Sequence, residues 1–161
     1  MDIGASTSNL YPRPTEEALD TLLGLGFRTL EVFVNTESET APHFVKELRR
    51  RADGMGGKIL SLHSYTSGID PFLLFSACRR RYEDGLEHCR HIFAAAALAG
   101  ARYVVDHGDK AGGVLPEEEV FARYAHLYDL GRAEGVTLLQ EYVVQFRSGD
   151  PAFLRRMRTA L

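Results

Sequence analysis

The sequence predicts an α/β fold that is built around a parallel β-sheet. Short runs rich in leucine and β-branched residues alternate along the chain with longer amphipathic segments, and this order is typical of strand–helix units joined by right-handed crossovers. Three of the short runs end in a residue that can bind a metal ion, namely His63, His107 and Glu141. Because parallel strands bring their C-terminal ends to one face, we expect these residues to converge in a site for a divalent cation.

The first third of the chain contains two strand–helix units. Pro14 and Thr15 are typical of a helix start, and glycines stop both helical patterns. The expected elements are a strand at Asp2 to Ala5, a polar loop at Ser6 to Asn9, a helix from Pro14 to Gly24, a strand at Thr29 to Phe33, and a helix from Pro42 to the glycines at 54, 56 and 57.

The rest of the chain supplies three more units. Gly100 stops one long helix, the acidic turn Glu117 to Glu119 favours the N-terminal end of a helix dipole, and Asp150 with Pro151 begins the last helix. The expected elements are strands at Lys58 to His63, Tyr103 to His107 and Thr137 to Glu141, a loop at Ser64 to Ser76 with room to cover an active-site mouth, and helices from about Ala77 to Leu98, from Pro116 to Gly135 and from Asp150 onward.

The number of units limits the architecture. Strand starts recur about every 25 to 45 residues, so a barrel of eight units needs on the order of 250 residues. The chain has 161 residues and five such units, and it ends on a helix. We therefore expect one domain over residues 1–161, which is either an open five-stranded sheet or a barrel cut short.

Composition excludes several classes of protein. A net charge of -3 and a pI near 6.1 argue against nucleic-acid binding, which needs a basic face, and the arginine clusters at 49–51 and 79–81 are interpreted as solvated helix faces. The longest apolar stretch, Ile92 to Ala99, is too short to span a membrane. With Cys78 and Cys89 as the only cysteines and no signal sequence, the expected location is the cytoplasm.

Several short motifs, in order, resemble the xylose isomerase-like TIM barrels, a family of sugar isomerases and epimerases that also includes the endonuclease IV type of repair enzyme. The motifs run through essentially the whole chain. They are Ile3-Gly4-Ala5-Ser6-Thr7, Leu25-Gly26-Phe27-Arg28-Thr29-Leu30-Glu31, Leu62-His63-Ser64-Tyr65, His107-Gly108-Asp109, and Gly135-Val136-Thr137 with Gln140-Glu141.

The resemblance implies a partial (β/α)8 barrel and a metal-dependent sugar or sugar-phosphate isomerase or epimerase. It implies a divalent metal (Mn, Mg, Co or Zn) with Glu141 as the most regular ligand, and it matches His63 and His107 to residues that lie near metal or substrate. The family's other ligands come from strands six to eight, so the chain is expected to be an N-terminal portion with an incomplete site. Family members commonly carry asparagine where this chain has Tyr142, so the support of Glu141 is expected to differ.

The predicted site residues each have a plainer interpretation as well. Glu141 and His107 are predicted to be catalytic and, with His63, to bind the metal. His63, Tyr65 and Lys110 are predicted to bind substrate. His63 could instead be a residue that packs the loop. Lys110 could be a solvated loop lysine, and Tyr65 could simply anchor its loop.

Three further positions complete the sequence predictions. Asp106 is expected to point away from the site by strand alternation. Glu31 is expected either to face the barrel interior as a polar group near substrate or to form a buried structural salt bridge. The histidines and cysteine at 88, 89 and 91 are interpreted as helix packing rather than a metal cluster.

Two other functions remain open from the sequence. One is an apurinic endonuclease-like phosphodiester hydrolase, which the acidic charge disfavours. The other is a catalytically inactive partial barrel. In either case the exposed edges of an open sheet favour pairing between chains, so a homo-oligomer is expected.

Overall fold

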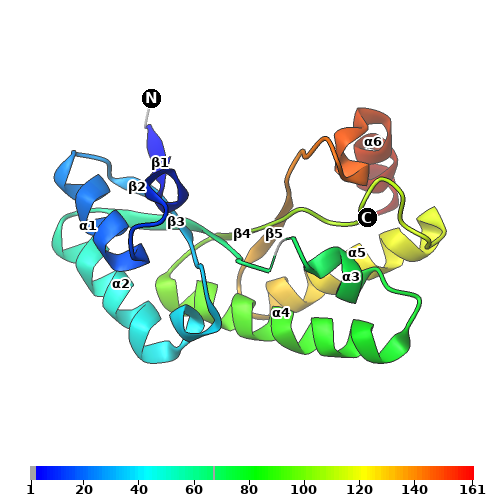
Figure 1. Cartoon of the computed structure of the whole chain (residues 1–161), viewed down its shortest axis with the longest axis horizontal. Helices are drawn as coiled ribbons and strands as arrows, with labels where there is room; N and C mark the ends of the chain where they lie inside the picture. Colours follow the sequence, from blue (N-terminus) through cyan, green and yellow to red (C-terminus); the bar gives the residue numbers. More distant parts are fainter. Residues whose placement is uncertain (1–2, 67) are drawn as a thin grey trace.

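The described part of the protein, residues 3–66 and 68–161 of a computed structural model, is a five-stranded parallel sheet with helices between the strands. Figure 1 shows α1 and α6 at opposite ends of the molecule. The strands are β1 (Gly4–Ser6), β2 (Thr29–Phe33), β3 (Lys58–His63), β4 (Tyr103–Asp106) and β5 (Thr137–Gln140), and the helices are α1 (Thr15–Gly24), α2 (Pro42–Gly54), α3 (Asp70–Leu74), α4 (Arg79–Ala99), α5 (Glu117–Ala133) and α6 (Pro151–Ala160).

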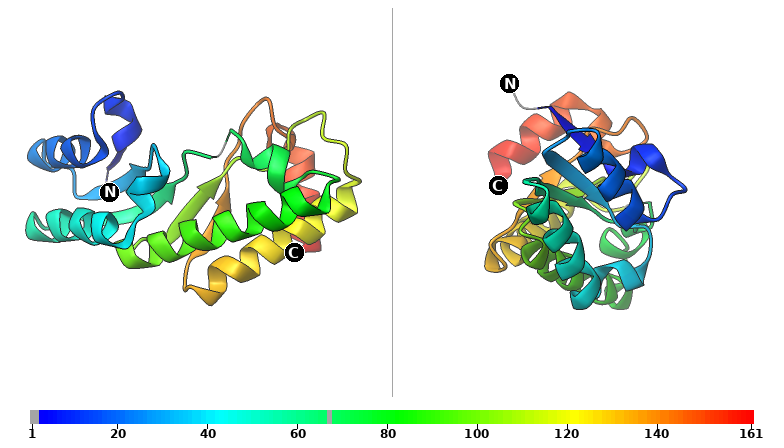
Figure 2. Two further views of the ribbon diagram at one scale, coloured as in Figure 1. Left: turned by 60° about the horizontal axis from the view of Figure 1, so that its bottom comes forward. Right: turned by 90° about the vertical axis from the view of Figure 1, so that its left-hand side faces the viewer.

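The strand order is β1-β2-β3-β4-β5, so each strand pairs with the next one along the chain. This consecutive order is that of a barrel wall, because a doubly wound sheet reverses its strand order partway. Figure 2 shows α2, α4 and α5 along one side of the sheet. The predicted α/β fold, a partial barrel of five parallel β/α units, is confirmed, and the sheet is open with β1 and β5 at its edges.

The elements agree closely with the sequence pattern. The second and third strands have the predicted bounds, and Pro42 begins α2 as expected. Asp150 caps α6 by accepting hydrogen bonds from the amides of Ala152 and Phe153. The first strand begins at Gly4 rather than at Asp2, and Asp2 lies outside the described residues.

The predicted loop at Ser64 to Ser76 is not wholly irregular, because it contains the short helix α3. A helix of five residues is too short to show an apolar period, so the sequence pattern had no means of revealing it. Ser67 of this segment lies outside the described residues.

The core lies between the sheet and its helices. In β2 the side chains of Leu30 and Val32 are 0% and 1% exposed and pack toward the helices, whereas Thr29, Glu31 and Phe33 alternate onto the opposite, inner face. A second cluster of buried side chains joins α3, α4, α5 and α6. In the described residues no helix has both the length and the apolar composition that crossing a lipid bilayer requires.

One irregularity sets the register of β3. Leu30 pairs with Ile59, but the next residue, Glu31, pairs with Ser61, so Leu60 is an extra residue in β3. Such a bulge changes the side on which the following side chains emerge. Ser61 and His63 therefore share the inner face with Glu31 and Phe33.

Candidate metal centre

The register of β3, β4 and β5 aligns the three predicted ligands on the inner face. His63 pairs with Val105, and Val105 pairs with Leu139. His107 and Glu141 lie two residues beyond these partners and so emerge on the same face. The amide of Glu141 donates to the carbonyl of Asp106 over 2.8 Å, which continues the pairing of the two strands past their ends.

The side chains of His63, His107 and Glu141 meet at the C-terminal ends of the strands. The Glu141 Oε2 atom lies 2.9 Å from His107 Nε2 and 3.3 Å from His63 Nε2. One potential ligand atom from each residue lies within 4.8 Å of the other two, and among the described residues this is the one group of three or more His, Cys, Asp or Glu side chains that does so. We refer to these three residues as the triad.

The hydrogen bonds of His63 identify the role of its second nitrogen. Its Nδ1 atom lies 3.3 Å from the carbonyl oxygen of Ser64, which only accepts, so Nδ1 carries the hydrogen. In the neutral ring the Nε2 lone pair then faces the Glu141 carboxylate, which also only accepts. Two facing acceptors need a cation or a proton between them, so the residues present fit a divalent metal ion.

The electrostatics of His107 favour the same arrangement. Burial, and then the neighbouring His63, lower the pKa of His107, while the Glu141 carboxylate opposes this shift. A lowered pKa keeps the imidazole neutral near pH 7, and a neutral imidazole is the form that binds a metal. The His63 side chain is 7% exposed and that of Glu141 is 45% exposed, so the centre is open on the glutamate side.

Comparison with known proteins identifies the architecture. No family model and no curated protein matches the sequence. Among solved structures, the chain is similar to a D-tagatose 3-epimerase-like protein with a TM-score of 0.79 at 18% identity, covering 98% of this chain and 60% of that one. It is similar to a D-psicose 3-epimerase with a TM-score of 0.74 at 16% identity, with coverage of 98% and 60%. A xylose isomerase-like TIM barrel/4-hydroxyphenylpyruvate dioxygenase fusion protein gives a TM-score of 0.76 at 19% identity, with coverage of 99% and 25%.

The fold is that of the xylose isomerase-like TIM barrels. The chain spans about 60% of the length of the D-psicose 3-epimerase and of the D-tagatose 3-epimerase-like protein, and its five strands correspond to part of such a barrel. The triad therefore lies at the C-terminal mouth of the barrel strands, the end at which TIM-barrel enzymes place their active sites.

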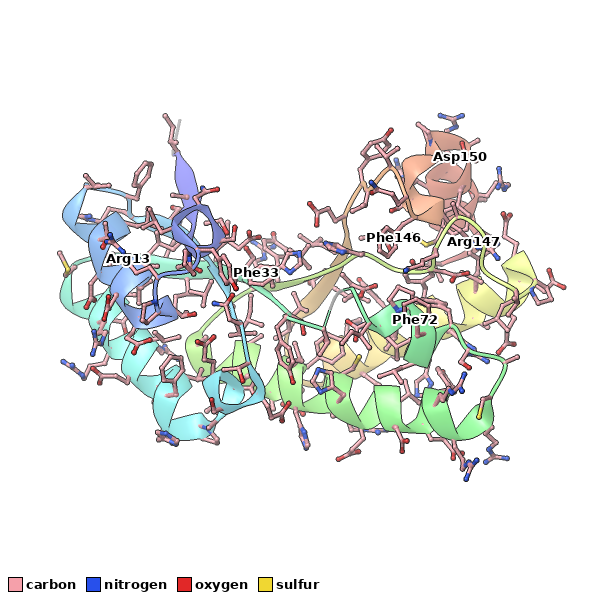
Figure 3. The ribbon with its side chains drawn as sticks, in the orientation of Figure 1. Arg13, Phe33, Phe72, Phe146, Arg147 and Asp150 are labelled. Carbon is pink, nitrogen blue, oxygen red and sulfur yellow. The ribbon has the colours of Figure 1, made fainter. Side chains whose placement is uncertain are left out.

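Two aromatic rings flank the triad from strands on either side. Phe33, at the end of β2, stacks on the His63 ring at 4.6 Å between centroids, and Phe146, beyond β5, meets the His107 ring edge-on at 5.3 Å. Figure 3 shows Phe33 and Phe146 on the two sides of the middle of the molecule. Sequence reasoning missed both. For Phe33 the available signal was its place at a strand end, two residues after Glu31.

Buried contacts hold the loops behind these rings. Arg147 Nε lies 2.8 Å from Asp109 Oδ2, and the Arg147 amide donates to the Asp109 carbonyl over 2.8 Å. This pairing ties the segment after β5 to the loop after β4 and keeps Phe146 against His107. Gln140 adds a further tie, because its Nε2 donates to the carbonyl of His107 over 2.7 Å. Tyr142, which follows Glu141, is 56% exposed.

Two predicted substrate-binding residues make their contacts away from the triad. The Tyr65 hydroxyl donates to Glu37 Oε2 over 2.5 Å, and its ring packs edge-on against His88 of α4. The Lys110 ammonium lies 4.1 Å from the centre of the Phe72 ring. The structure thus brings together the three predicted metal ligands and does not bring Tyr65 or Lys110 to them.

Other sequence alternatives are also resolved by the contacts. Glu31 is half-buried on the inner face and accepts a hydrogen bond from Ser61 over 3.2 Å, which agrees with the interior position. Asp106 points to the helix side as strand alternation required, and it is 7% exposed there. His88 packs against Thr66 rather than joining a metal cluster.

Proposed function

We propose that this protein is a metal-dependent isomerase or epimerase of a sugar or sugar phosphate. The observation that supports it most is the triad, in which two imidazoles and one carboxylate present their donor atoms within 4.8 Å of one another at the barrel mouth. The similar structures include a D-psicose 3-epimerase and an L-ribulose 3-epimerase. Their chemistry interconverts hydroxy-ketones, which is the kind of reaction that such a centre suits.

In this proposal His63, His107 and Glu141 hold a divalent ion, which is Mn, Mg, Co or Zn. When bound, the ion supplies electrophilic polarisation of a carbonyl and its neighbouring hydroxyl, which favours an enediolate or a hydride shift. The Ser64 carbonyl orients the His63 ring, and Phe33 and Phe146 limit rotation of both imidazoles.

Glu141 has a second role in the same proposal. Its Oε2 atom faces both histidines, which leaves Oε1 free to take or give a proton on the open side of the centre. A carboxylate in this position is a suitable general base for a hydrogen next to a carbonyl.

A metal titration tests the proposal. Calorimetry with Zn²⁺, Mn²⁺, Co²⁺ and Mg²⁺ compares the parent chain with Glu141→Ala, and Glu118→Ala is the matched control because Glu118 is exposed on α5. We expect binding in the parent and in the control, and at least a tenfold weaker affinity in Glu141→Ala. Equal affinity in all three proteins, or none in the parent, contradicts the metal centre.

Activity is tested separately from metal binding. The metal-loaded chain is screened against ketoses, aldoses and their phosphates, with epimer formation followed by NMR. Conversion that is lost in Glu141→Ala supports the proposed reaction. Metal binding without conversion of any of them supports the inactive partial barrel instead, and hydrolysis of abasic-site DNA supports the endonuclease alternative.

We also propose a cytoplasmic location and a homo-oligomer. The location is supported by the free thiols of Cys78 and Cys89. The oligomer is supported by the edge strands of the described sheet and by exposed apolar side chains near them, among which Ile3 is 67% and Val144 is 74% exposed. Sedimentation velocity tests the oligomer, and a clean monomer across a hundredfold range of concentration contradicts it.

A further inference from the structure

A second polar cluster lies on the helix side of the sheet, behind the triad. A cavity of about 20 Å³ lies there between β4, α4 and α5. Its polar wall consists of Ser64, Thr66, Asp70, His88 and Asp106, and the rest of its lining is largely apolar. A cavity of this volume holds one occupant of about the size of a water molecule.

The carboxylate of Asp106 is the least satisfied group in this wall. Asp106 is 7% exposed, and its Oδ2 atom has no hydrogen-bond partner among residues 3–66 and 68–161. A buried carboxylate with an unpartnered oxygen is costly unless a ligand satisfies it.

Asp70 brings a second carboxylate to the same wall. It is 5% exposed and accepts a hydrogen bond from the Thr66 hydroxyl over 3.2 Å. A hydroxyl is neutral, so it leaves the charge of Asp70 uncompensated. Two buried acidic groups that share one cavity repel each other when both are ionised.

The described lining offers no fixed positive charge to balance them. It contains no lysine or arginine. Its imidazole, His88, is engaged on other atoms, because Nε2 lies 3.1 Å from the Thr66 hydroxyl and Nδ1 lies 3.8 Å from Glu37 Oε2. The cavity therefore combines negative charge, unsatisfied oxygen and room for one small guest.

We propose that this cavity binds a single alkali cation, Na⁺ or K⁺, between the carboxylates of Asp70 and Asp106 and the hydroxyl oxygens of Ser64 and Thr66. Carboxylate and hydroxyl oxygens suit hard cations. The volume leaves no space for the water shell that Mg²⁺ retains. The triad differs in kind, because it offers two imidazole nitrogens and is open to solvent.

Thermal unfolding in different salts tests the proposal. The protein is melted in EDTA, to keep the triad free of divalent ions, with 0.1 M NaCl, KCl or tetramethylammonium chloride. We expect Na⁺ or K⁺ to raise the Tm by about 2 to 4 °C over the bulky cation, which does not fit the cavity. Asp106→Asn keeps the shape of the side chain and should abolish this difference.

Two controls separate the site from general salt effects. Asp84→Asn removes an exposed acid from α4 and should keep the full preference for Na⁺ or K⁺. Equal Tm values in the three salts for the parent, or a preference that survives Asp106→Asn, overturn the proposal.

A direct measurement covers the case in which Asp106→Asn fails to fold. Crystals of the parent soaked in thallium(I) acetate should show anomalous density between Asp70 and Asp106, because Tl⁺ replaces alkali ions of similar size. An empty cavity, or a water molecule without anomalous signal, overturns the proposal.

Discussion

Two polar clusters are built from neighbouring residues at the same strand ends, and they differ in character. His63 and His107 face the inner side of the sheet and meet Glu141, whose side chain is 45% exposed. Ser64 and Asp106, each adjacent in sequence to one of these histidines, turn to the helix side and line a small cavity. Strand alternation alone separates the two clusters. The comparison teaches that the face of the strand decides whether a polar side chain lies in an open cluster or in a buried one.

The largest expected effect comes from breaking the helix-side cluster. Phe93 is 2% exposed and lines the cavity, so Phe93→Ala should lower the free energy of unfolding by about 3 to 5 kcal/mol. Zinc affinity of the folded protein should change less than twofold, because Phe93 packs on the opposite side of the sheet from the triad. Urea denaturation and calorimetry measure the two quantities.

An exposed aromatic residue provides the control for that substitution. Phe72 is 57% exposed, so Phe72→Ala should cost less than about 1 kcal/mol. A tenfold loss of zinc affinity in folded Phe93→Ala would mean that the two clusters are coupled.

A smaller effect distinguishes the two thiols. Burial raises the pKa of Cys89, which lines the cavity, well above its ordinary value, whereas the backbone amides of Arg81 and Arg80 lower the pKa of Cys78. Because the thiolate is the reactive form, iodoacetamide at pH 7.5 should modify Cys78 at least about tenfold faster. Peptide mass spectrometry gives both rates. Equal rates would show that the cavity wall opens readily to solvent.

The smallest expected effect concerns the titration of His107 in the metal-free protein. Its pKa is lowered by burial and by His63, and Glu141 opposes this shift; Glu141→Gln should therefore lower the pKa further. Between the pKa of His107 in the folded protein and its ordinary value of about 6.5, the unfolded chain binds more protons at this residue than the folded chain does. The free energy of unfolding therefore rises with pH in that window, and this gain is lost as the pH falls. NMR of the imidazole protons measures the shift, and a rise in Glu141→Gln would contradict the assigned geometry.

Much of the fold follows from the sequence because strands and long helices carry periodic signals. The bounds of β2 and β3 match the prediction, and α4 begins at Arg79 and ends at Ala99 against an expected 77–98. That His63, His107 and Glu141 lie at the same end of the sheet follows from parallel strands, whereas the inner-face position of His63 also depends on the bulge at Leu60. What could not be predicted depends on how loops pack.

Loop side chains account for most of the missed features of the site. Lys110 and Tyr65 lie beyond strand ends, where no period fixes the direction of a side chain, and their contacts with Phe72 and Glu37 appear only in three dimensions. Asp70 reaches the cavity from the short helix α3, which lacks a sequence signal. The direction of Asp106 was predictable, but its carboxylate neighbour was not.

The extra residue in β3 decides on which face of the sheet His63 lies. Ile59 pairs with the helix-facing Leu30, and Leu60 is the extra residue that allows His63 to pair with Phe33. In a regular strand that kept Leu60 without the bulge, the alternation from Ile59 would run unbroken and His63 would turn toward the helices. One further in-frame codon between Leu62 and His63 would shift this alternation by one residue and turn the proposed metal ligand His63 away from the inner face, while every ligand codon stayed intact. The site therefore depends on the number of residues within β3 as well as on the identity of its side chains.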